Sequence, residues 1–230
     1  MIFFSVIFFI LSIFSPIKEV PNKQTVVLIH GFMGNQFNLT PIRYSLKKEG
    51  YRVINFSYPS REKNIEDHAA DLVAVLNDIA SNNKGEPIYF VTHSMGGLVL
   101  RAALNNKNCP NEAKIGKVAM LAPPNKGALI ARKLYGLKFP RKILGYKAGW
   151  QMMVNNNFNY ELPKTLKILV ASGTFNLNPL LRNEGVSDGV ILQKETDLQV
   201  DYEKVVVKAG HLGICYSPTV IKSIKKFFNN

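Results

Sequence analysis

Short apolar runs alternate with amphipathic stretches along most of this chain. The clearest periodicity lies between residues 65 and 79, where apolar side chains recur about every 3.6 residues, as on one face of a helix. Similar patterns over 38–49, which ends at Gly50, and over 217–228 predict two more helices. The apolar face of the clearest helix is formed by Ile65, Ala69, Leu72, Leu76 and Ile79.

Six apolar runs have the length and the β-branched content of strands that are buried on both faces. Strands that alternate with helices predict an α/β domain with a mainly parallel sheet covered by helices on both faces. Functional groups are then expected at the carboxyl ends of the strands. The runs cover residues 25–30, 51–58, 117–121, 166–171 and 203–208, together with the run that begins at Pro87.

The first residues differ from the rest of the chain. Residues 2–14 are apolar and uncharged, and Ser15 and Pro16 end the run. This run is shorter than the roughly 20 residues that span a bilayer and is close to the apolar core of a signal peptide. We therefore expect residues 1–20 to be a signal sequence or a membrane anchor, and residues 21–230 to form one domain. The protein is then exported or membrane-associated through residues 1–16.

Composition limits the partners and the cofactors. The 230 residues include 29 Lys and Arg against 16 Asp and Glu, a formal charge of +13, which favours anionic surfaces. No nucleic-acid motif accompanies this charge, so we expect a phospholipid surface and no nucleic acid. Cys109 and Cys215 have neither metal-ligand nor redox spacing, and we interpret both as buried or half-buried thiols. No metal and no organic cofactor is predicted.

The run that begins at Pro87 leads directly into Ser94, two glycines and a helix-like stretch. A strand, a sharp turn and a helix are the parts of a nucleophile elbow, in which the turn exposes a serine above the edge of the sheet. Thr92 stands where the G-x-S-x-G pattern has its first glycine, while Gly96 occupies the second glycine position. The alternative is an ordinary Ser-Gly turn between a strand and a helix.

A nucleophilic serine needs an imidazole to take its proton and a carboxylate to orient that imidazole. His211 follows the last predicted strand, between Gly210 and Leu212. Asp188 opens an Asp-Gly turn that leads into apolar residues, after the fifth strand. The predicted nucleophile, acid and base are therefore Ser94, Asp188 and His211.

Other residues compete for these roles. Asp197 and Asp201 are rival acids, although neither begins so well-formed a turn. We place His68 on the polar side of its amphipathic helix, and His93 directly precedes the serine. His30 ends a strand before a glycine, which favours a structural role over that of a base.

Acyl transfer also needs N–H donors for the negative charge that develops on the carbonyl oxygen. The glycine-bearing turn after the first strand can direct a main-chain N–H into the space beside the elbow. We predict that the N–H groups of Phe32 and Met95 form this oxyanion hole.

These motifs resemble those of the α/β-hydrolases, and specifically of the small bacterial lipases and related esterases. The resemblance covers residues 25–229 and rests on 27–32, 93–97, 188–191 and 210–214, the last followed by Tyr-Ser. It implies a minimal α/β-hydrolase fold of six strands that lacks the first two strands of larger members. It also implies the strand order 2-1-3-4-5-6 and a cap or lid insertion.

Residues 127–160, between the fourth and fifth strands, are the predicted cap. The stretch 129–153 is rich in apolar residues and holds six positive charges and no acid. One interpretation is a cap that packs on the body with solvated lysines outside. The other is a mobile cover whose basic side meets anionic lipid. The candidates for lining an acyl pocket are Leu134, Tyr135, Phe139 and Trp150.

The motifs together predict a serine hydrolase that cleaves carboxylic esters, lipids first among them, through an acyl-serine intermediate. An acyltransferase would use the same three side chains and differ only in what attacks the acyl-enzyme. A non-catalytic, membrane-attached binding protein could keep the fold without the chemistry. Labelling by a serine-reactive fluorophosphonate distinguishes the enzymes from the binding protein.

Overall fold

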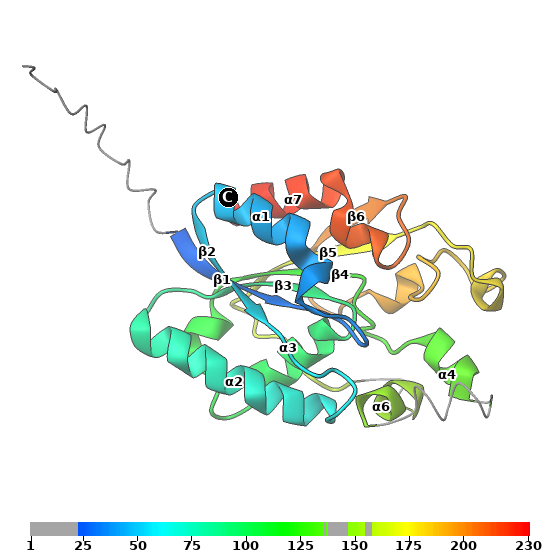
Figure 1. Ribbon diagram of the computed structural model, residues 1–230, viewed down its shortest axis with the longest axis horizontal. Helices are drawn as coiled ribbons and strands as arrows, with labels where there is room; N and C mark the ends of the chain where they lie inside the picture. The colour runs from blue at the N-terminus through cyan, green and yellow to red at the C-terminus, as the bar shows by residue number, and fades with distance from the viewer. Residues whose placement is uncertain (1–22, 136, 138–146, 155–157) are drawn as a thin grey trace, which may run out of the picture.

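A six-stranded sheet organises the computed structural model, which describes residues 23–135, 137, 147–154 and 158–230. Every neighbouring pair of strands is parallel, and the strand order is β2-β1-β3-β4-β5-β6 (Figure 1). The predicted α/β class and the predicted strand order are therefore confirmed, with a sheet that is wholly parallel. The strands are β1 (Lys23–Ile29), β2 (Tyr51–Phe56), β3 (Tyr89–His93), β4 (Lys117–Leu121), β5 (Lys167–Gly173) and β6 (Glu203–Val207).

Helices cover both faces of the sheet, with α1 and α7 on one face and α2 and α3 on the other (Figure 1). Two further helices, α4 and α6, lie between β4 and β5 in sequence. The helices are α1 (Thr40–Lys48), α2 (Ile65–Asn82), α3 (Gly96–Leu104), α4 (Leu129–Tyr135), α6 (Ala148–Val154) and α7 (Pro218–Asn229). Short 3-10 helices lie at Gln36–Leu39, Asn111–Lys114, Pro179–Leu181, Gln193–Glu195 and Gly213–Tyr216.

Local sequence explains where the helices begin. Asp67 helps to cap the start of α2, because its carboxylate accepts a hydrogen bond from the Asn64 N–H at 3.3 Å. Ser217 caps α7, and Pro218 occupies its first turn, where a missing N–H costs nothing. The predicted helix over 38–49 is shorter than expected, because its first residues form a 3-10 turn before α1.

The strands divide the core into two clusters. Side chains of β1 alternate, so that Val27 and Ile29 pack towards α2 and α3, whereas Val26 and Leu28 pack towards α1 and α7. All four are at most 1% exposed. Burial on both faces explains why the strand sequences are continuous apolar runs.

His68 corrects one expectation. We placed it on the polar side of α2, yet it is fully buried, with 0% exposure, and its ring meets that of Tyr58 edge to face at 4.6 Å. The helical spacing explains this burial, because position 68 lies three residues after Ile65 and four before Leu72, on the buried face of the helix. Both cysteines are free and buried, as the sequence analysis proposed.

The predicted signal sequence or anchor lies in residues 1–20, outside the described residues. Within the described part of the chain, no helix is both long enough and apolar enough to cross a membrane.

Candidate active site

Ser94 lies at the apex of the turn between β3 and α3. Its φ angle is 53°, in the left-handed region that non-glycine residues rarely adopt. The turn is closed by hydrogen bonds from the Gly97 N–H to the Ser94 carbonyl (2.9 Å) and from the Ser94 N–H to the Leu121 carbonyl (2.8 Å). The strand, the strained serine and the helix are therefore arranged as a nucleophile elbow requires.

Thr92 occupies the position where the elbow pattern has glycine, and its side chain is fully buried. A Cβ atom built on Gly97 would lie only 3.3 Å from the Thr92 hydroxyl and 3.2 Å from Pro123 Cβ. A larger residue at 97 would therefore crowd the threonine. Gly97, which has no side chain, therefore leaves room for the Thr92 side chain.

Asp188 and His211 are joined directly. Nδ1 of His211 lies 2.8 Å from Oδ2 of Asp188, and the aspartate is 4% exposed. The other carboxylate oxygen accepts hydrogen bonds from the N–H groups of Val190 (2.9 Å) and Ile191 (2.7 Å). The His211 N–H also donates to the Asp188 carbonyl at 2.9 Å. The acid turn thus fixes both the side chain and the main chain of the histidine.

This arrangement determines the histidine tautomer. Since Nδ1 of His211 donates to a carboxylate, Nε2 carries the lone pair and can accept a proton. Among the described residues, no hydrogen bond joins this imidazole to the Ser94 hydroxyl; catalytic hydrogen bonds are often longer before substrate binds. The loop of His211 is nevertheless tied to the elbow, because Nε2 of His93 lies 2.9 Å from the His211 carbonyl oxygen.

The rival acids have other partners. Asp197 accepts a hydrogen bond from the Tyr202 hydroxyl at 2.9 Å and pairs with Lys126 and Lys204. Asp201 is exposed at the surface. Of the three candidate acids, only Asp188 contacts His211.

The loop after β1 lies directly against the serine. A Cβ atom on Gly31 would be 2.9 Å from Cβ of Ser94, so a larger residue could not be accommodated there without movement. Within the described residues, neither the Phe32 N–H nor the Met95 N–H donates a hydrogen bond, whereas the Met33 N–H is bound to the Ser60 hydroxyl at 2.9 Å. Neither of the two donors predicted for the oxyanion hole therefore has a partner among the described residues, although Met95 is fully buried.

His30 supports this loop, in agreement with the structural role expected for it. Its Nε2 accepts a hydrogen bond from the Tyr58 N–H at 3.3 Å, so Nδ1 carries the proton and donates to the Gly31 carbonyl at 2.9 Å. The Tyr58 hydroxyl donates to the His30 carbonyl at 2.8 Å, and the two rings stack at 4.4 Å. Burial lowers the pKa of His30, which keeps its imidazole neutral.

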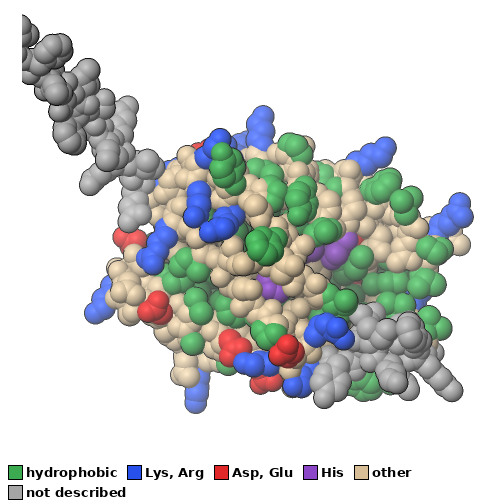
Figure 2. All heavy atoms as spheres, viewed as in Figure 1, with side chains coloured by type: hydrophobic (Ala, Val, Ile, Leu, Met, Phe, Trp, Pro, Cys, Tyr) green, Lys and Arg blue, Asp and Glu red, His purple; other side chains and the backbone are tan. Residues whose placement is uncertain are grey.

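Exposed apolar side chains border these loops. Met33 is 57% exposed and Leu212, next to His211, is 48% exposed. Figure 2 shows hydrophobic side chains at the surface beside the histidine side chains on this face. Apolar surface near a reactive group is typical of a site for a ligand with hydrocarbon parts.

The predicted cap is described only in part. Tyr135 of α4 and Trp150 of α6 meet edge to face at 5.3 Å, which joins the two helices. Leu134 is half-buried and Trp150 is 42% exposed, while Phe139 lies outside the described residues.

Among the described basic residues of the insertion, Arg132 and Lys133 have acidic partners outside it. Arg132 lies 3.7 Å from Glu195, and Lys133 contacts Glu184. Lys138, Arg141 and Lys142 lie outside the described residues, and Lys147 has interactions of its own. The basic stretch is therefore not wholly a free charged face.

Sequence analysis missed Arg101, a buried arginine on α3. Its guanidinium donates to the carbonyls of Phe158, Tyr160 and Asn125 and to the Asn125 side chain, at distances from 2.5 to 3.4 Å. Asn125 precedes residues 127–157 and the other two follow them, so one side chain holds both ends of the insertion. The one feature of the sequence that could have indicated a buried arginine is its place as the single charge in the otherwise apolar stretch 98–104.

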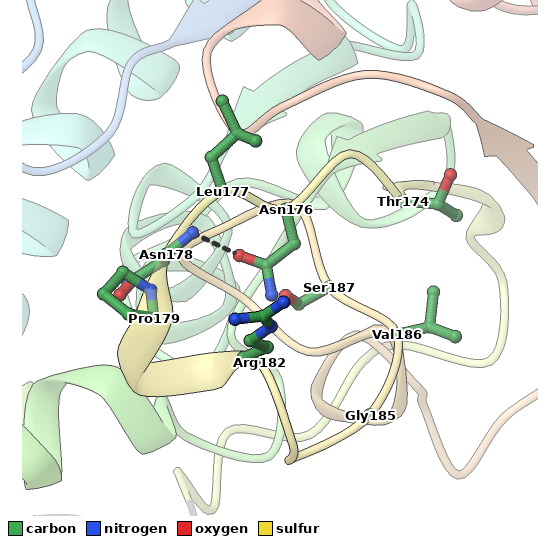
Figure 3. A pocket seen from close by; sticks show the side chains of 9 residues that line it. All are labelled: Thr174, Asn176, Leu177, Asn178, Pro179, Arg182, Gly185, Val186 and Ser187. Atoms are coloured by element: carbon green, nitrogen blue, oxygen red, sulfur yellow. Dashed lines mark hydrogen bonds between the residues drawn. The ribbon is translucent and has the colours of Figure 1, made fainter.

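A cavity of about 640 Å³ lies behind the acid turn. It is bounded by the segments 174–179 and 182–187, and Figure 3 shows the Arg182 guanidinium directed towards Asn176 and Ser187. Ser94 and His211 are not among its lining residues, so this cavity is separate from the space above the elbow. In the described part of the chain, no three His, Cys, Asp or Glu side chains are grouped to hold a metal ion.

The fold and the elbow define a class of protein, and the sequence comparison agrees. Residues 26–212 match the family described as "Alpha/beta hydrolase family", and the chain belongs to this family. No curated protein sequence is significantly similar to the chain.

Several solved structures share the fold. The mature lipase BlEst2 of Bacillus licheniformis superposes with a TM-score of 0.76 at 19% identity, over 90% of this chain and 93% of that one. The esterase Pf2001 of Pyrococcus furiosus gives 0.63 at 18% identity, over 92% and 84%. A lipase-esterase related protein of Clostridium acetobutylicum gives 0.58 at 12% identity, over 90% and 96%. The protein is thus an α/β-hydrolase that resembles lipases and esterases.

Proposed function

We propose that this protein is a serine hydrolase that cleaves carboxylic esters through an acyl-serine intermediate. The observation that carries the proposal is the 2.8 Å hydrogen bond between His211 and the buried Asp188, in a loop that is tied to the elbow of Ser94. A buried carboxylate that orients an imidazole beside the serine of an elbow is the arrangement that activates a hydroxyl group.

In the first half of the reaction, Ser94 Oγ attacks the ester carbonyl carbon while His211 Nε2 takes the hydroxyl proton. Asp188 stabilises the resulting imidazolium, and the N–H groups of Phe32 and Met95 donate to the oxyanion. His211 then gives the proton to the leaving alkoxide, which departs as the alcohol. In the second half, His211 deprotonates a water molecule that attacks the acyl-serine, and the carboxylic acid leaves with Ser94 restored.

Lipid esters are the substrate class that we propose. The exposed apolar side chains beside the site favour a substrate with hydrocarbon chains, and the structural neighbours include proteins named lipase and esterase. The formal charge of +13 favours an anionic lipid surface as a partner. Residues 1–16 would direct the protein out of the cytosol or hold it at a membrane.

The test of the activity uses p-nitrophenyl esters from acetate to palmitate, below and above micelle formation. The wild-type protein should hydrolyse them, and Ser94→Ala should lose nearly all of that activity while keeping its circular dichroism spectrum. Equal activity in Ser94→Ala would refute the proposal. Transfer of the acyl group to an added alcohol in preference to water would identify an acyltransferase instead, and a folded but inactive wild type would favour a binding protein.

The surface partner is tested with vesicles. A basic charge near an anionic membrane contributes about 1 kcal/mol, and salt screens it within roughly 8 Å at physiological ionic strength. The chain that begins at Pro21 should therefore bind phosphatidylserine vesicles at low salt, release them at high salt, and ignore phosphatidylcholine vesicles. Binding that does not change with salt would contradict the electrostatic part of the proposal.

A further inference from the structure

The imidazole of His93 has no part in the reaction steps above, although it adjoins the nucleophile. Its residue is 6% exposed, and its ring centroid lies 4.7 Å from that of His211, at an interplanar angle of 45°. Its Nε2 lies 2.9 Å from the His211 main-chain oxygen. A buried imidazole beside the proposed base needs a physical explanation.

The hydrogen bond has one possible direction. A carbonyl oxygen can only accept, so Nε2 of His93 carries the proton and Nδ1 carries the lone pair. Burial, and then the adjacent His211, lower the pKa of His93 to about 3. The ring therefore remains a neutral donor at any pH at which the protein is assayed.

The main chain around His211 depends on this bond. Gly210 precedes the histidine and Gly213 follows two residues later, so the local backbone has little side-chain packing to hold it. The His211 N–H is held by the Asp188 carbonyl at 2.9 Å, and its carbonyl is held by His93. The first contact fixes the histidine to the acid turn, and the second fixes it to the elbow.

We propose that His93 is a positioning residue, which holds His211 in register with Ser94 through a hydrogen bond to the His211 main-chain carbonyl. This inference rests on the proposed function, since it assigns His93 a role in the same site. A neutral donor suits the position because His211 becomes positively charged during the reaction. A permanent cation at 4.7 Å would oppose that charge.

Two substitutions separate the hydrogen bond from packing. His93→Gln keeps a neutral amide donor, whereas His93→Phe keeps the volume of the ring and removes the donor. On a short soluble ester, His93→Phe should lower kcat by about 10- to 100-fold with KM nearly unchanged, because a small misplacement of the base slows the reaction without weakening binding. His93→Gln should recover most of the loss.

A second measurement does not depend on activity. The Nδ1 proton that His211 shares with Asp188 gives a downfield proton resonance, which should exchange with water faster in His93→Phe than in the wild type or in His93→Gln. This measurement is made on Ser94→Ala as well, so it remains valid if the wild type hydrolyses no ester. An inactive wild type with the expected exchange pattern would refute the proposed function but support the positioning role.

Two results would overturn the inference. One is a folded His93→Phe with wild-type kcat and wild-type proton exchange. The other is an equal defect in the glutamine and phenylalanine variants, which would assign His93 a packing role alone. If His93→Phe does not fold, His93→Met replaces it, since methionine also fills the space without donating a hydrogen bond.

Discussion

Two regions of the molecule are held in different ways. The strand-end site consists of residues 30–34, 93–97, 187–191 and 210–212, and the insertion consists of residues 127–160. In the strand-end site, most hydrogen bonds join groups of the same turn or main-chain atoms of neighbouring turns. In the insertion, several anchoring bonds come from charged side chains of distant elements.

Three charged residues anchor the insertion. Arg101 of α3 binds the main-chain oxygen of Asn125, just before the insertion, and those of Phe158 and Tyr160 at its end. Glu195 is 4% exposed and accepts a hydrogen bond from the Leu129 N–H at 2.6 Å. Glu66 of α2 accepts from Gln151 at 2.6 Å and from the Tyr160 hydroxyl.

Because different contacts hold the strand-end site and the insertion, we expect that one region can be perturbed without the other. The strand-end site is built on the sheet, where the backbone is fixed by the strands. Two anchors of the insertion, Arg101 and Glu195, are buried charges, and removing one partner from such a contact leaves the remaining groups unsatisfied. We therefore expect substitutions in the site to change the chemistry and substitutions at the anchors to change the stability.

The largest expected effect is that of Asp188→Asn. The neutral amide favours the wrong histidine tautomer and cannot stabilise an imidazolium, so kcat should fall by about 10⁴-fold with the fold retained. Steady-state kinetics together with thermal unfolding measure both properties. Asp201→Asn, at an exposed position, is the control and should be active. Near-normal activity of Asp188→Asn would transfer the role of the acid to another carboxylate.

The second effect concerns the insertion. Arg101→Met leaves buried carbonyls without donors and should lower the free energy of unfolding by about 3 kcal/mol. The kcat of the folded variant for a short ester should stay within about threefold of wild type, because the site is held by other contacts. Equilibrium urea unfolding and steady-state kinetics test the two parts.

Lys164→Met is the matched control for this variant, since Lys164 is exposed and lines, together with Arg101, a second cavity of about 580 Å³. It should change the free energy of unfolding by less than about 0.5 kcal/mol. A large loss of kcat in folded Arg101→Met would show that the two regions are coupled.

Lowering the pH should destabilise the part of the domain outside the insertion, because all four histidines lie there. Burial lowers the pKa values of His93 and His68 below 6.5, to about 3 for His93. Below pH 6.5 the unfolded chain therefore binds protons that the folded chain does not, and the free energy of unfolding falls as the pH decreases towards the folded pKa values.

His93, which stays neutral in the folded protein, should alone remove about 2 kcal/mol at pH 5 relative to pH 7.5. Urea unfolding at the two pH values measures the loss of unfolding free energy. In His93→Gln this loss should be smaller by the contribution of His93. Equal free energies of unfolding at pH 7.5 and pH 5 would contradict the burial of these groups.

The smallest effect concerns Tyr58, which supports the loop of the predicted oxyanion hole. Tyr58→Phe keeps the ring that stacks on His30 but removes the hydroxyl that binds the His30 carbonyl. We expect a loss of about 1 kcal/mol in unfolding free energy and a decrease in kcat of up to about tenfold. Tyr202→Phe loses a hydroxyl bound to Asp197, neither of which belongs to the strand-end site, and should leave kcat unchanged. A wild-type kcat in Tyr58→Phe would show that the loop does not depend on this bond.

The same comparison explains how much could be predicted from the sequence. Ser94, Asp188 and His211 each lie in a short turn whose residues specify its shape, and the strand runs were long enough to place the strands within about two residues. The fold class could therefore be predicted, as could the contact between Asp188 and His211, whereas the strand order was implied by the resemblance to the α/β-hydrolases.

The buried charges Arg101 and Glu195 could not be predicted in the same way. Their partners include residues far away in the sequence, and charged residues are rarely buried. A buried charge becomes favourable only when the fold supplies its hydrogen-bond partners, and no local pattern contains that information. Prediction from the sequence is thus limited by how far apart the interacting residues lie along the chain.

The central claim is that Ser94 is an activated nucleophile, and labelling with a fluorophosphonate probe tests it most directly. The full-length wild-type protein should incorporate one probe per chain, with the adduct on the peptide that contains Ser94. Ser94→Ala should incorporate none, and Asp188→Asn should react far more slowly. Labelling of Ser94→Ala at the wild-type rate, or a folded wild type that does not react, would contradict the account.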